Sequence, residues 1–324
     1  MNPTDTTTAL VTGATSGLGF ESAIHLAHDG YGRIVVTGRT IERATAAARA
    51  MAERTGTDVF HPLALDLNES TSVSSALAEL TAAAQPISVL ILNAGMVGGS
   101  QLVHTAEHVE ITFASSLVGH HQLTMGLLDA GLVAEDARIV IAGSEAARGD
   151  VPTFTPVDLP SYADEHFGGD REAAAESLIP FDGPLKYQPA AVYATAKLFV
   201  AWWASSLAER LPAGTTVNAV SPGSAPGTDA GRNATFFMKR VMMPVMKRAP
   251  KRLGLAAPVA VAAARYTDAA RFGPEVSGAF FASAPRKMTG PLHRVDLPHV
   301  DDRVSRDAAW AATVAVAGQA TTAV

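Results

Sequence analysis

The stretch Thr12-Gly13-Ala14-Thr15-Ser16-Gly17-Leu18-Gly19 decides the fold of this chain. A short apolar run, Ala9-Leu10-Val11, precedes it, and a helical pattern begins at Phe20. Glycine permits positive φ angles and lets the backbone approach a ligand closely. The first N–H groups of a helix lack partners and attract negative charge. A strand that turns on glycines into a helix is therefore typical of a phosphate-binding site, with an ordinary turn as the alternative interpretation.

Beyond this turn, short apolar or β-branched runs alternate with helical patterns along the chain. The runs predict strands at 9–11, 33–37, 59–65, 87–92, 138–142, 216–220 and 278–282. The helical patterns predict helices at 20–29, 41–54, 70–84, 104–128, 191–210 and 257–271. This alternation indicates an α/β fold with a doubly wound parallel sheet and helices on both faces. Ligands of such sheets bind beyond the carboxyl ends of the strands.

The length of 324 residues allows one large domain or two smaller ones. We interpret residues 1–300 as a single domain. It contains an expected insertion at about 150–188, rich in proline, glycine and acidic residues and helical near 171–177. A methionine-rich segment at about 224–252 is an expected substrate lid. Residues 301–324 are an expected tail that frays or caps a neighbouring element.

Composition narrows the class of protein. Hydrophobic residues make up 48% of the chain, which allows a large core, and the net charge of −6 does not favour nucleic acid as a partner. The chain has no cysteine, which excludes disulfides and thiol chemistry. We expect no signal peptide and no membrane span, because the first residues are polar and no long apolar run occurs. A cytoplasmic location suits these features.

Tyr193 and Lys197 are four residues apart on a predicted helix, so both side chains lie on the same face. A free tyrosine titrates near about 10 and is a poor acid at neutral pH. A neighbouring cation favours the phenolate and lowers the tyrosine pKa, which suits general acid catalysis. A surface pair on an ordinary helix is the alternative interpretation.

Ser144 follows the predicted strand at 138–142. At that position its hydroxyl could hydrogen-bond a carbonyl oxygen and stabilise charge that develops there. The alternative is a serine that caps a helix or a turn.

The T-G-x-x-x-G-x-G spacing together with Tyr193 and Lys197 resembles the short-chain dehydrogenase/reductase superfamily. The resemblance implies a Rossmann fold and an oxidoreductase in which Tyr193 exchanges the proton. It implies that Lys197 holds the nicotinamide ribose and that Ser144 positions the substrate. Many members place a catalytic asparagine where this chain has Ser116. We expect this departure to affect the rate of the reaction and not the fold. We expect the neighbouring His120 and His121 to serve packing or the surface, because no carboxylate or cysteine stands at metal-ligand spacing.

The resemblance also implies the residues that contact the cofactor. These are Gly13, Thr15, Ser16, Gly17, Leu18, Gly19, Asp66, Leu67, Asn93, Ala94, Gly95, Tyr193, Lys197, Pro222, Gly223 and, from looser spacing, Thr228. The choice between cofactors depends on the residue after the second strand. An acid there binds the ribose 2′-hydroxyl of NAD, whereas an arginine accommodates the 2′-phosphate of NADP. This chain has Arg39 there and no acid before Glu42, which favours NADP(H), and Arg43 is a possible second contact.

The substrate side resembles the protochlorophyllide-reductase and retinol-dehydrogenase-like branch of the superfamily. The long gap between Ser144 and Tyr193 and the stretch Phe181-Asp182-Gly183 carry this resemblance. It implies a bulky lipophilic substrate. Tyr187 is a second tyrosine near the site, but only Tyr193 has a lysine four residues on. The methionine-rich residues 236–248 are interpreted as a lid, with a packing helix or a membrane-surface contact as alternatives.

The predicted function is an NADP(H)-dependent oxidoreductase that interconverts a carbonyl and an alcohol on a lipophilic small molecule. One alternative is a non-enzymatic NADP-binding regulator on the same fold. Another is an epimerase or dehydratase that uses the nicotinamide transiently. Oligomers are common in the superfamily, so a homodimer is possible, although the insertion could block one usual interface.

Overall fold

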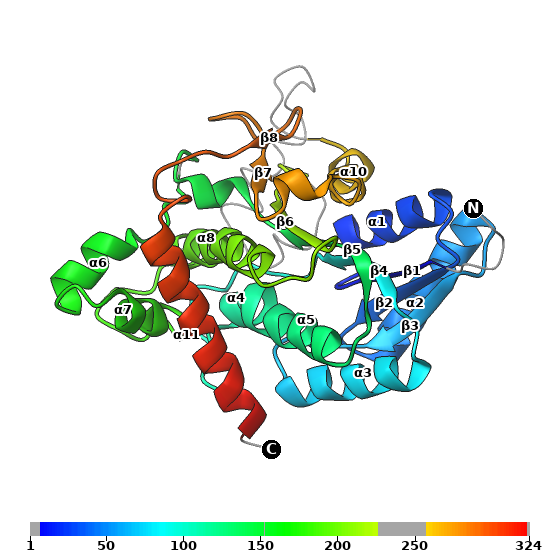
Figure 1. The fold of residues 1–324 in the computed structure, drawn as a ribbon, viewed down its shortest axis with the longest axis horizontal. Coiled ribbons are helices and arrows are strands. Elements are labelled where there is room, and N and C mark those ends of the chain that lie inside the picture. Colours follow the sequence, from blue (N-terminus) through cyan, green and yellow to red (C-terminus); the bar gives the residue numbers. More distant parts are fainter. Residues whose placement is uncertain (1–6, 152, 226–256, 323–324) are drawn as a thin grey trace.

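The structure is a computed structural model that describes residues 7–151, 153–225 and 257–322. Its centre is an eight-stranded sheet with the order β3-β2-β1-β4-β5-β6-β7-β8 (Figure 1). All pairs are parallel except β7 and β8, which are antiparallel at one edge. The strands are β1 (Thr8–Val11), β2 (Arg33–Gly38), β3 (Phe60–Ala64), β4 (Ile87–Leu92), β5 (Val133–Ala142), β6 (Thr216–Val220), β7 (Phe280–Ala282) and β8 (His293–Arg294). The predicted doubly wound parallel sheet is confirmed.

The strand order reverses direction between β1 and β4. The chain first builds outward from β1 through β2 to β3, and then returns to place β4 on the other side of β1. Loops that leave the carboxyl ends of β1 and β4 diverge at this point, which creates a crevice for a ligand. The glycine turn after β1 and Asn93 after β4 both lie there.

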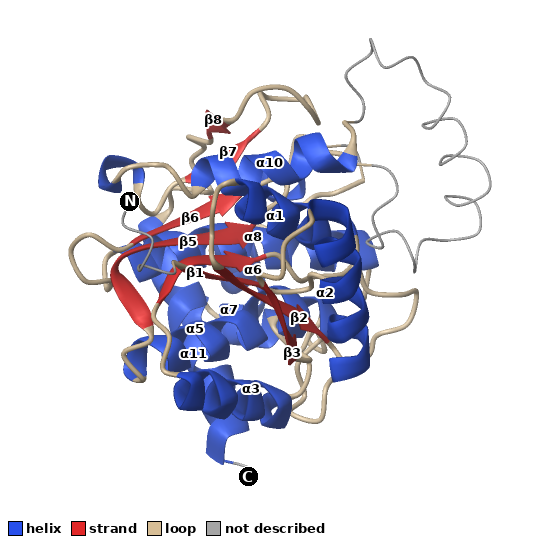
Figure 2. Cartoon of the chain, turned by 90° about the vertical axis from the view of Figure 1, so that its right-hand side faces the viewer, coloured by secondary structure: helices blue, strands red, loops and turns tan. Residues whose placement is uncertain are grey.

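Helices cover both faces of the sheet (Figures 1 and 2). One face packs against α1 (Gly17–His28), α2 (Ile41–Thr55) and α10 (Val259–Ala269). The other packs against α3 (Ser70–Ala83), α5 (Gly119–Asp129), α8 (Pro189–Ala208) and α11 (Arg303–Thr322). Burial of apolar side chains between these layers is the main favourable contribution to folding. Trp202 and Trp203 of α8 are its largest fully buried side chains.

The predicted long helix at 104–128 begins later than expected. Helical structure starts with α4 (Ile111–Phe113), continues through a π-helical turn, η1 (Ala114–Val118), and passes into α5. His108 has a φ of +61°, which a helix does not allow. The Glu110 carboxylate then accepts hydrogen bonds from the backbone N–H groups of Thr112 and Phe113, at 2.7 and 3.2 Å. This cap defines the start of the helix.

The insertion and the C-terminal segment pack against each other. The insertion contains the expected helix as α7 (Arg171–Leu178) and a second, unexpected one, α6 (Leu159–His166). Helix α11 (Arg303–Thr322) packs on α7, α8 and α5, which agrees with the expectation that this segment caps a neighbouring element. Arg171 donates to the Asp302 carboxylate at 2.8 Å and joins the two segments.

Among the described helices, none is both long and apolar enough to span a membrane. Thr228 and the methionine-rich residues 236–248 lie outside the described residues. The expected lid at 224–252 lies almost entirely outside them as well.

Candidate active site

The glycine turn is locked to the loop that follows β4. Gly13 and Gly17 have φ angles of +64° and +60°, a region that favours glycine. The Asn93 side-chain amide donates to the carbonyl oxygens of Thr12 and Gly13, at 2.9 and 3.3 Å. The Ala94 N–H donates to the Thr12 hydroxyl at 3.0 Å. These bonds fix the turn between β1 and α1 to the loop after β4, at the point where the strand order reverses.

Gly19 is the position where this turn leaves least room. A Cβ there would lie 2.5 Å from the Asn93 side-chain nitrogen and 2.6 Å from the Gly13 carbonyl oxygen. We expect Gly19→Ala to lower the free energy of unfolding by about 2 kcal/mol, because the backbone must shift to relieve the contact. Urea unfolding measures this change. The control is Gly318→Ala in α11, where a Cβ meets nothing within 4 Å and should be neutral or slightly stabilising. Equal stability of both variants would contradict the close approach.

His120 connects the glycine turn to the π-helical segment. Its Nδ1 lies 3.2 Å from the Ser116 carbonyl oxygen, which can only accept, so Nδ1 carries the proton. Its Nε2 therefore accepts from the Thr12 hydroxyl at 2.9 Å. Burial lowers the pKa of His120 to about 3 and that of His121 to about 4. His121 accepts from the Trp203 indole at 3.0 Å. The packing role expected for both histidines is confirmed.

A cavity of about 360 Å³ extends along this edge of the sheet. It brings together most of the residues expected to contact a cofactor: Gly13, Thr15, Ser16, Gly17, Leu18, Arg39, Asp66, Leu67, Asn93, Ala94, Gly95, Tyr193, Lys197 and Pro222. Gly19 and Gly223 lie outside its wall. Sequence reasoning did not assign to this site other wall residues, among them Thr37, Asn68, Met96, Val97, Ser115 and Tyr266.

The lining of this cavity suits a dinucleotide phosphate. The wall at the start of α1 is free of Cβ atoms at Gly13 and Gly17, and the first turn of α1 carries no acidic residue. The unpartnered N–H groups of such a helix start favour an anion. The residues present therefore fit a nicotinamide dinucleotide, whose pyrophosphate the glycine turn would hold.

Tyr193 and Lys197 line one end of the cavity, and Ser144 lies beside Tyr193 without being part of the cavity wall. The Lys197 ammonium nitrogen lies 5.8 Å from the centroid of the Tyr193 ring and donates to the Ala142 carbonyl oxygen at 2.7 Å. Ser144 is hydrogen-bonded to the Tyr193 side chain, and its hydroxyl also accepts from the Ala146 N–H at 3.2 Å. Ser144 thus caps the short helix η2 (Glu145–Arg148), as the alternative interpretation expected, and its contact with a substrate stays a prediction.

The electrostatics of the tyrosine differ from the expectation. Burial raises the pKa of Tyr193, the hydrogen bond with Ser144 lowers it, and the charge of Glu145 raises it further. We expected Lys197 to lower this pKa, but the lowering comes from Ser144. The reason is that the lysine is itself desolvated: burial lowers the pKa of Lys197 to about 8. With this pKa, most of the lysine is charged at pH 7, and the charge is lost around pH 8, before the tyrosine titrates.

Ser116 lies in the π-helical segment beside Lys197 and not in the cavity wall. A Cβ on Gly95 would stand 3.0 Å from the Ser116 hydroxyl oxygen and 3.5 Å from the Lys197 nitrogen, so both groups flank Gly95. Within the described part of the chain, the Ser116 hydroxyl is buried without a hydrogen-bond partner. Buried polar groups are rarely left unsatisfied, so this hydroxyl is suited to hold a water molecule.

The other end of the cavity is basic. Arg39 and Arg43 line it, and both residues are exposed. Glu42 lies outside the lining, at the start of α2. Asp66 lines the cavity too. Its carboxylate accepts a hydrogen bond from the Asn68 N–H at 3.0 Å, so it stabilises the local turn whether or not it contacts a ligand. The charges at this end favour a phosphate over an uncharged ribose.

Two aromatic residues of the insertion lie near the site in different roles. The Phe154 ring meets the Tyr193 ring edge-on, with centroids 5.7 Å apart, and sequence reasoning did not identify it. The Tyr187 hydroxyl instead donates to the buried Glu110 carboxylate at 3.3 Å and does not line the cavity. The preference for Tyr193 over Tyr187 therefore agrees with their positions.

A second cluster of titratable groups lies on the surface. His104, His108 and Asp182 each place one potential ligand atom within 4.8 Å of the others. His108 is already bound to Asp182 at 2.6 Å, and His104 is bound to the Pro180 carbonyl oxygen at 2.7 Å. These contacts join the loop before α4 to the end of the insertion, and sequence spacing did not predict them.

Comparison with known proteins finds related sequences and related folds. The short chain dehydrogenase family profile matches residues 7–156. The WW domain-containing oxidoreductase of Drosophila melanogaster is 31% identical over 257 residues, which cover 78% of this chain and 57% of that protein. Human retinol dehydrogenase 13 is 28% identical over 292 residues, which cover 88% of this chain and 78% of that protein. The chain belongs to the short-chain dehydrogenase/reductase superfamily of oxidoreductases, in its retinol-dehydrogenase-like branch.

Solved structures show the same fold. A variant of the actinorhodin polyketide ketoreductase, solved with NADPH, superposes with a TM-score of 0.62 at 22% sequence identity. The match covers 86% of this chain and 95% of that one. At this identity, the likeness supports the doubly wound architecture alone.

Proposed function

We propose that this chain is an NADP(H)-dependent oxidoreductase that interconverts a carbonyl and an alcohol on a lipophilic small molecule. The observation that supports this most is a single cavity with two distinct ends. One end joins the glycine turn to Arg39 and Arg43, and the other holds Tyr193 and Lys197. A dinucleotide phosphate and a reacting carbonyl need these two kinds of surface at opposite ends of one crevice.

In this proposal, the protein residues bind the substrate oxygen and move one proton. Ser144 donates to the substrate oxygen and holds it beside the Tyr193 hydroxyl. Tyr193 gives its proton to that oxygen in reduction and takes it back in oxidation. Lys197, anchored by the Ala142 carbonyl oxygen, would hold the nicotinamide ribose beside Tyr193. The bound nicotinamide would supply or accept the hydride.

The direct test is to incubate the protein with NADPH and a panel of aldehydes and ketones while absorbance at the nicotinamide band is followed. Oxidation of NADPH by at least one carbonyl supports the proposal. Tight NADPH binding without oxidation across the panel would favour the regulator, and product without net NADPH consumption would favour the epimerase or dehydratase.

The preference for NADP rests on Arg39, which lines the cavity where the 2′-phosphate would lie. We expect Arg39→Ala to raise the KM for NADPH by about tenfold and to leave the KM for NADH within about twofold, because the guanidinium binds phosphate through paired donors. Steady-state kinetics with both cofactors measure this. The control is Arg49→Ala, an exposed arginine of α2 outside the cavity. A preference for NADH that persists in Arg39→Ala would refute the assignment.

The lipophilic substrate is inferred from the cavity wall beside Tyr193. Met96 and Val97 line the cavity, and Phe154 packs against the tyrosine. Apolar side chains beside a reacting group favour apolar ligands with few polar contacts. The similarity to a retinol dehydrogenase agrees with this inference. Carbonyl compounds of increasing chain length should show a falling KM, whereas the opposite trend would exclude a lipophilic substrate.

A further inference from the structure

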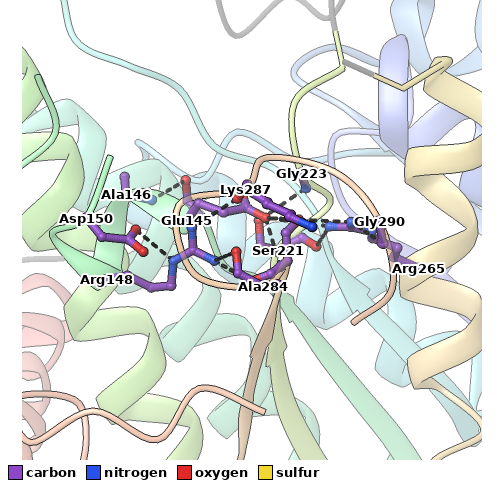
Figure 3. A network of polar contacts seen from close by, with 12 residues as sticks. Glu145, Ala146, Arg148, Asp150, Ser221, Gly223, Arg265, Ala284, Lys287 and Gly290 are labelled. Atoms are coloured by element: carbon purple, nitrogen blue, oxygen red, sulfur yellow. Dashed lines mark hydrogen bonds and ion pairs between the residues drawn. The ribbon is translucent and has the colours of Figure 1, made fainter. Parts of the chain in front are cut away.

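A buried ionic network adjoins Ser144 in the chain. Its centre is Glu145, which is 2% exposed. The Glu145 carboxylate accepts hydrogen bonds from the Ser221 hydroxyl and from both the N–H and the hydroxyl of Ser283, the latter two at 3.2 and 2.9 Å. Ser221 follows β6 and Ser283 follows β7, so one carboxylate joins the ends of three neighbouring strands (Figure 3).

Arg265 of α10 balances this charge. Its guanidinium lies 3.5 Å from the Glu145 carboxylate and donates to the Ser221 carbonyl oxygen at 3.0 Å. It also donates to the Ser283 hydroxyl at 3.0 Å and to the Gly290 carbonyl oxygen at 2.6 Å. These contacts fasten α10 to the loops after β6 and β7 and, through the ion pair, to the residue next to Ser144. The short helix η2 is therefore tied to α10 across the carboxyl edge of the sheet.

The network ends on the turn Ser221-Pro222-Gly223. The Ser221 hydroxyl, which donates to Glu145, accepts from the Gly223 N–H at 3.1 Å. Gly223 has a φ of +77°, and a Cβ on it would lie 2.9 Å from the Arg265 guanidinium. Pro222 forms part of the same cavity wall as Tyr193. The position of this wall relative to the tyrosine thus depends on Glu145 and Arg265.

We propose that Glu145 and Arg265 are positioning residues that hold the Ser221-Pro222-Gly223 turn against the nicotinamide end of the cavity, in register with Ser144. This inference rests on the proposed function. A buried ion pair is weak evidence for stability, because desolvation costs offset the attraction between its charges. A fully hydrogen-bonded pair does specify one geometry, and here that geometry joins a catalytic loop to a cofactor loop.

The test separates the nicotinamide end of the cofactor from its adenosine end. Calorimetric titrations measure the affinities for NADPH and for adenosine 2′,5′-bisphosphate, which lacks the nicotinamide. We expect Glu145→Gln to weaken NADPH binding by about tenfold, as expected for the loss of a charged hydrogen-bonding partner. The affinity for the bisphosphate should change by less than about twofold, because the glycine turn and Arg39 do not contact this network.

Ser221→Ala provides a second variant should Glu145→Gln fold poorly, because it removes one hydroxyl and retains the ion pair. It should show the same selective loss. The control is Asp150→Asn, which alters a neighbouring ion pair: Asp150 accepts from Arg148 at 2.9 Å and from the Arg286 N–H at 2.8 Å (Figure 3). That pair holds the loop after β7 without contact to Ser221, so Asp150→Asn should leave both affinities unchanged.

The outcomes distinguish the two proposals. Equal losses for both ligands in Glu145→Gln and Ser221→Ala would mean a general structural role and would overturn the positioning inference. Unchanged affinities in both variants would overturn it as well. Wild-type protein that fails to bind NADPH would overturn the proposed function and, with it, this inference. A selective loss of NADPH affinity supports both.

Discussion

Replacing Tyr193 with phenylalanine is expected to reduce turnover by about 10³-fold, because the variant loses the hydroxyl that exchanges the proton. The Kd for NADPH should change by less than about twofold, since the ring and its edge-on contact with Phe154 remain. Single-turnover oxidation of NADPH measures the first quantity and fluorescence titration the second. The two readouts together separate a role in chemistry from a role in binding.

The matched control is Tyr187→Phe. Tyr187 is also a tyrosine at the end of the insertion, but its hydroxyl donates to Glu110 and not into the cavity. This variant should keep nearly full turnover and lose some thermal stability, because the buried carboxylate loses one donor. Turnover that survives Tyr193→Phe, or that disappears in Tyr187→Phe, would remove Tyr193 from the mechanism.

Lys197→Met is expected to lower turnover by about a hundredfold and, at pH 7, to make the protein more stable. Burial lowers the pKa of Lys197 from 10.5 to about 8, so the folded state binds this proton less tightly than the unfolded state. The contribution of Lys197 to the free energy of unfolding therefore rises between about pH 8 and pH 10.5. This contribution is lowest below pH 8. The buried charge costs about 3 kcal/mol at pH 7, offset by about 1 kcal/mol for the hydrogen bond to Ala142.

Thermal melts of the wild type and Lys197→Met at pH 7 and pH 9.5 test this sign. The stability gain of the variant should be clear at pH 7 and should shrink at pH 9.5, where the folded wild type has lost most of this charge. Lys186→Met, at an exposed lysine of the insertion, should show no such trend. A variant less stable than the wild type at pH 7, or a gain independent of pH, would contradict the desolvated lysine.

Local sequence patterns predicted the elements of this fold well where the signal is itself local. The strands at 33–37, 87–92 and 216–220 appear within a residue of their expected bounds, because short β-branched runs bounded by turn residues have few other conformations. The helix expected from 104 begins seven residues later, at Ile111, since a left-handed residue and a carboxylate cap decide where it begins. Helix α6 and strand β8 were not expected; in the structure α6 packs on α7, and β8 pairs with β7 at the edge of the sheet.

The candidate site also contains residues that local sequence patterns predicted and residues that they did not. Sequence spacing identified Gly13, Tyr193 and Lys197 because their geometry follows from one turn or from one helix face. It could not find Phe154 or Tyr266, since neither has a local pattern: the fold brings Phe154 against the Tyr193 ring and Tyr266 into the cavity wall. It also misassigned the group that lowers the pKa of Tyr193, because burial and hydrogen-bond partners are properties of the assembled structure.

The sequence by itself thus determined the α/β alternation, the glycine turn and the Tyr193–Lys197 pair, each encoded within a few neighbouring residues. Only the tertiary structure decided the desolvation of Lys197, the burial of the Ser116 hydroxyl without a partner among the described residues, and the Glu145–Arg265 network. The physical reason is the separation along the chain over which each effect acts. Backbone preferences and helix periodicity act over a few residues, whereas burial and ionic pairing depend on segments more than a hundred residues apart in the chain.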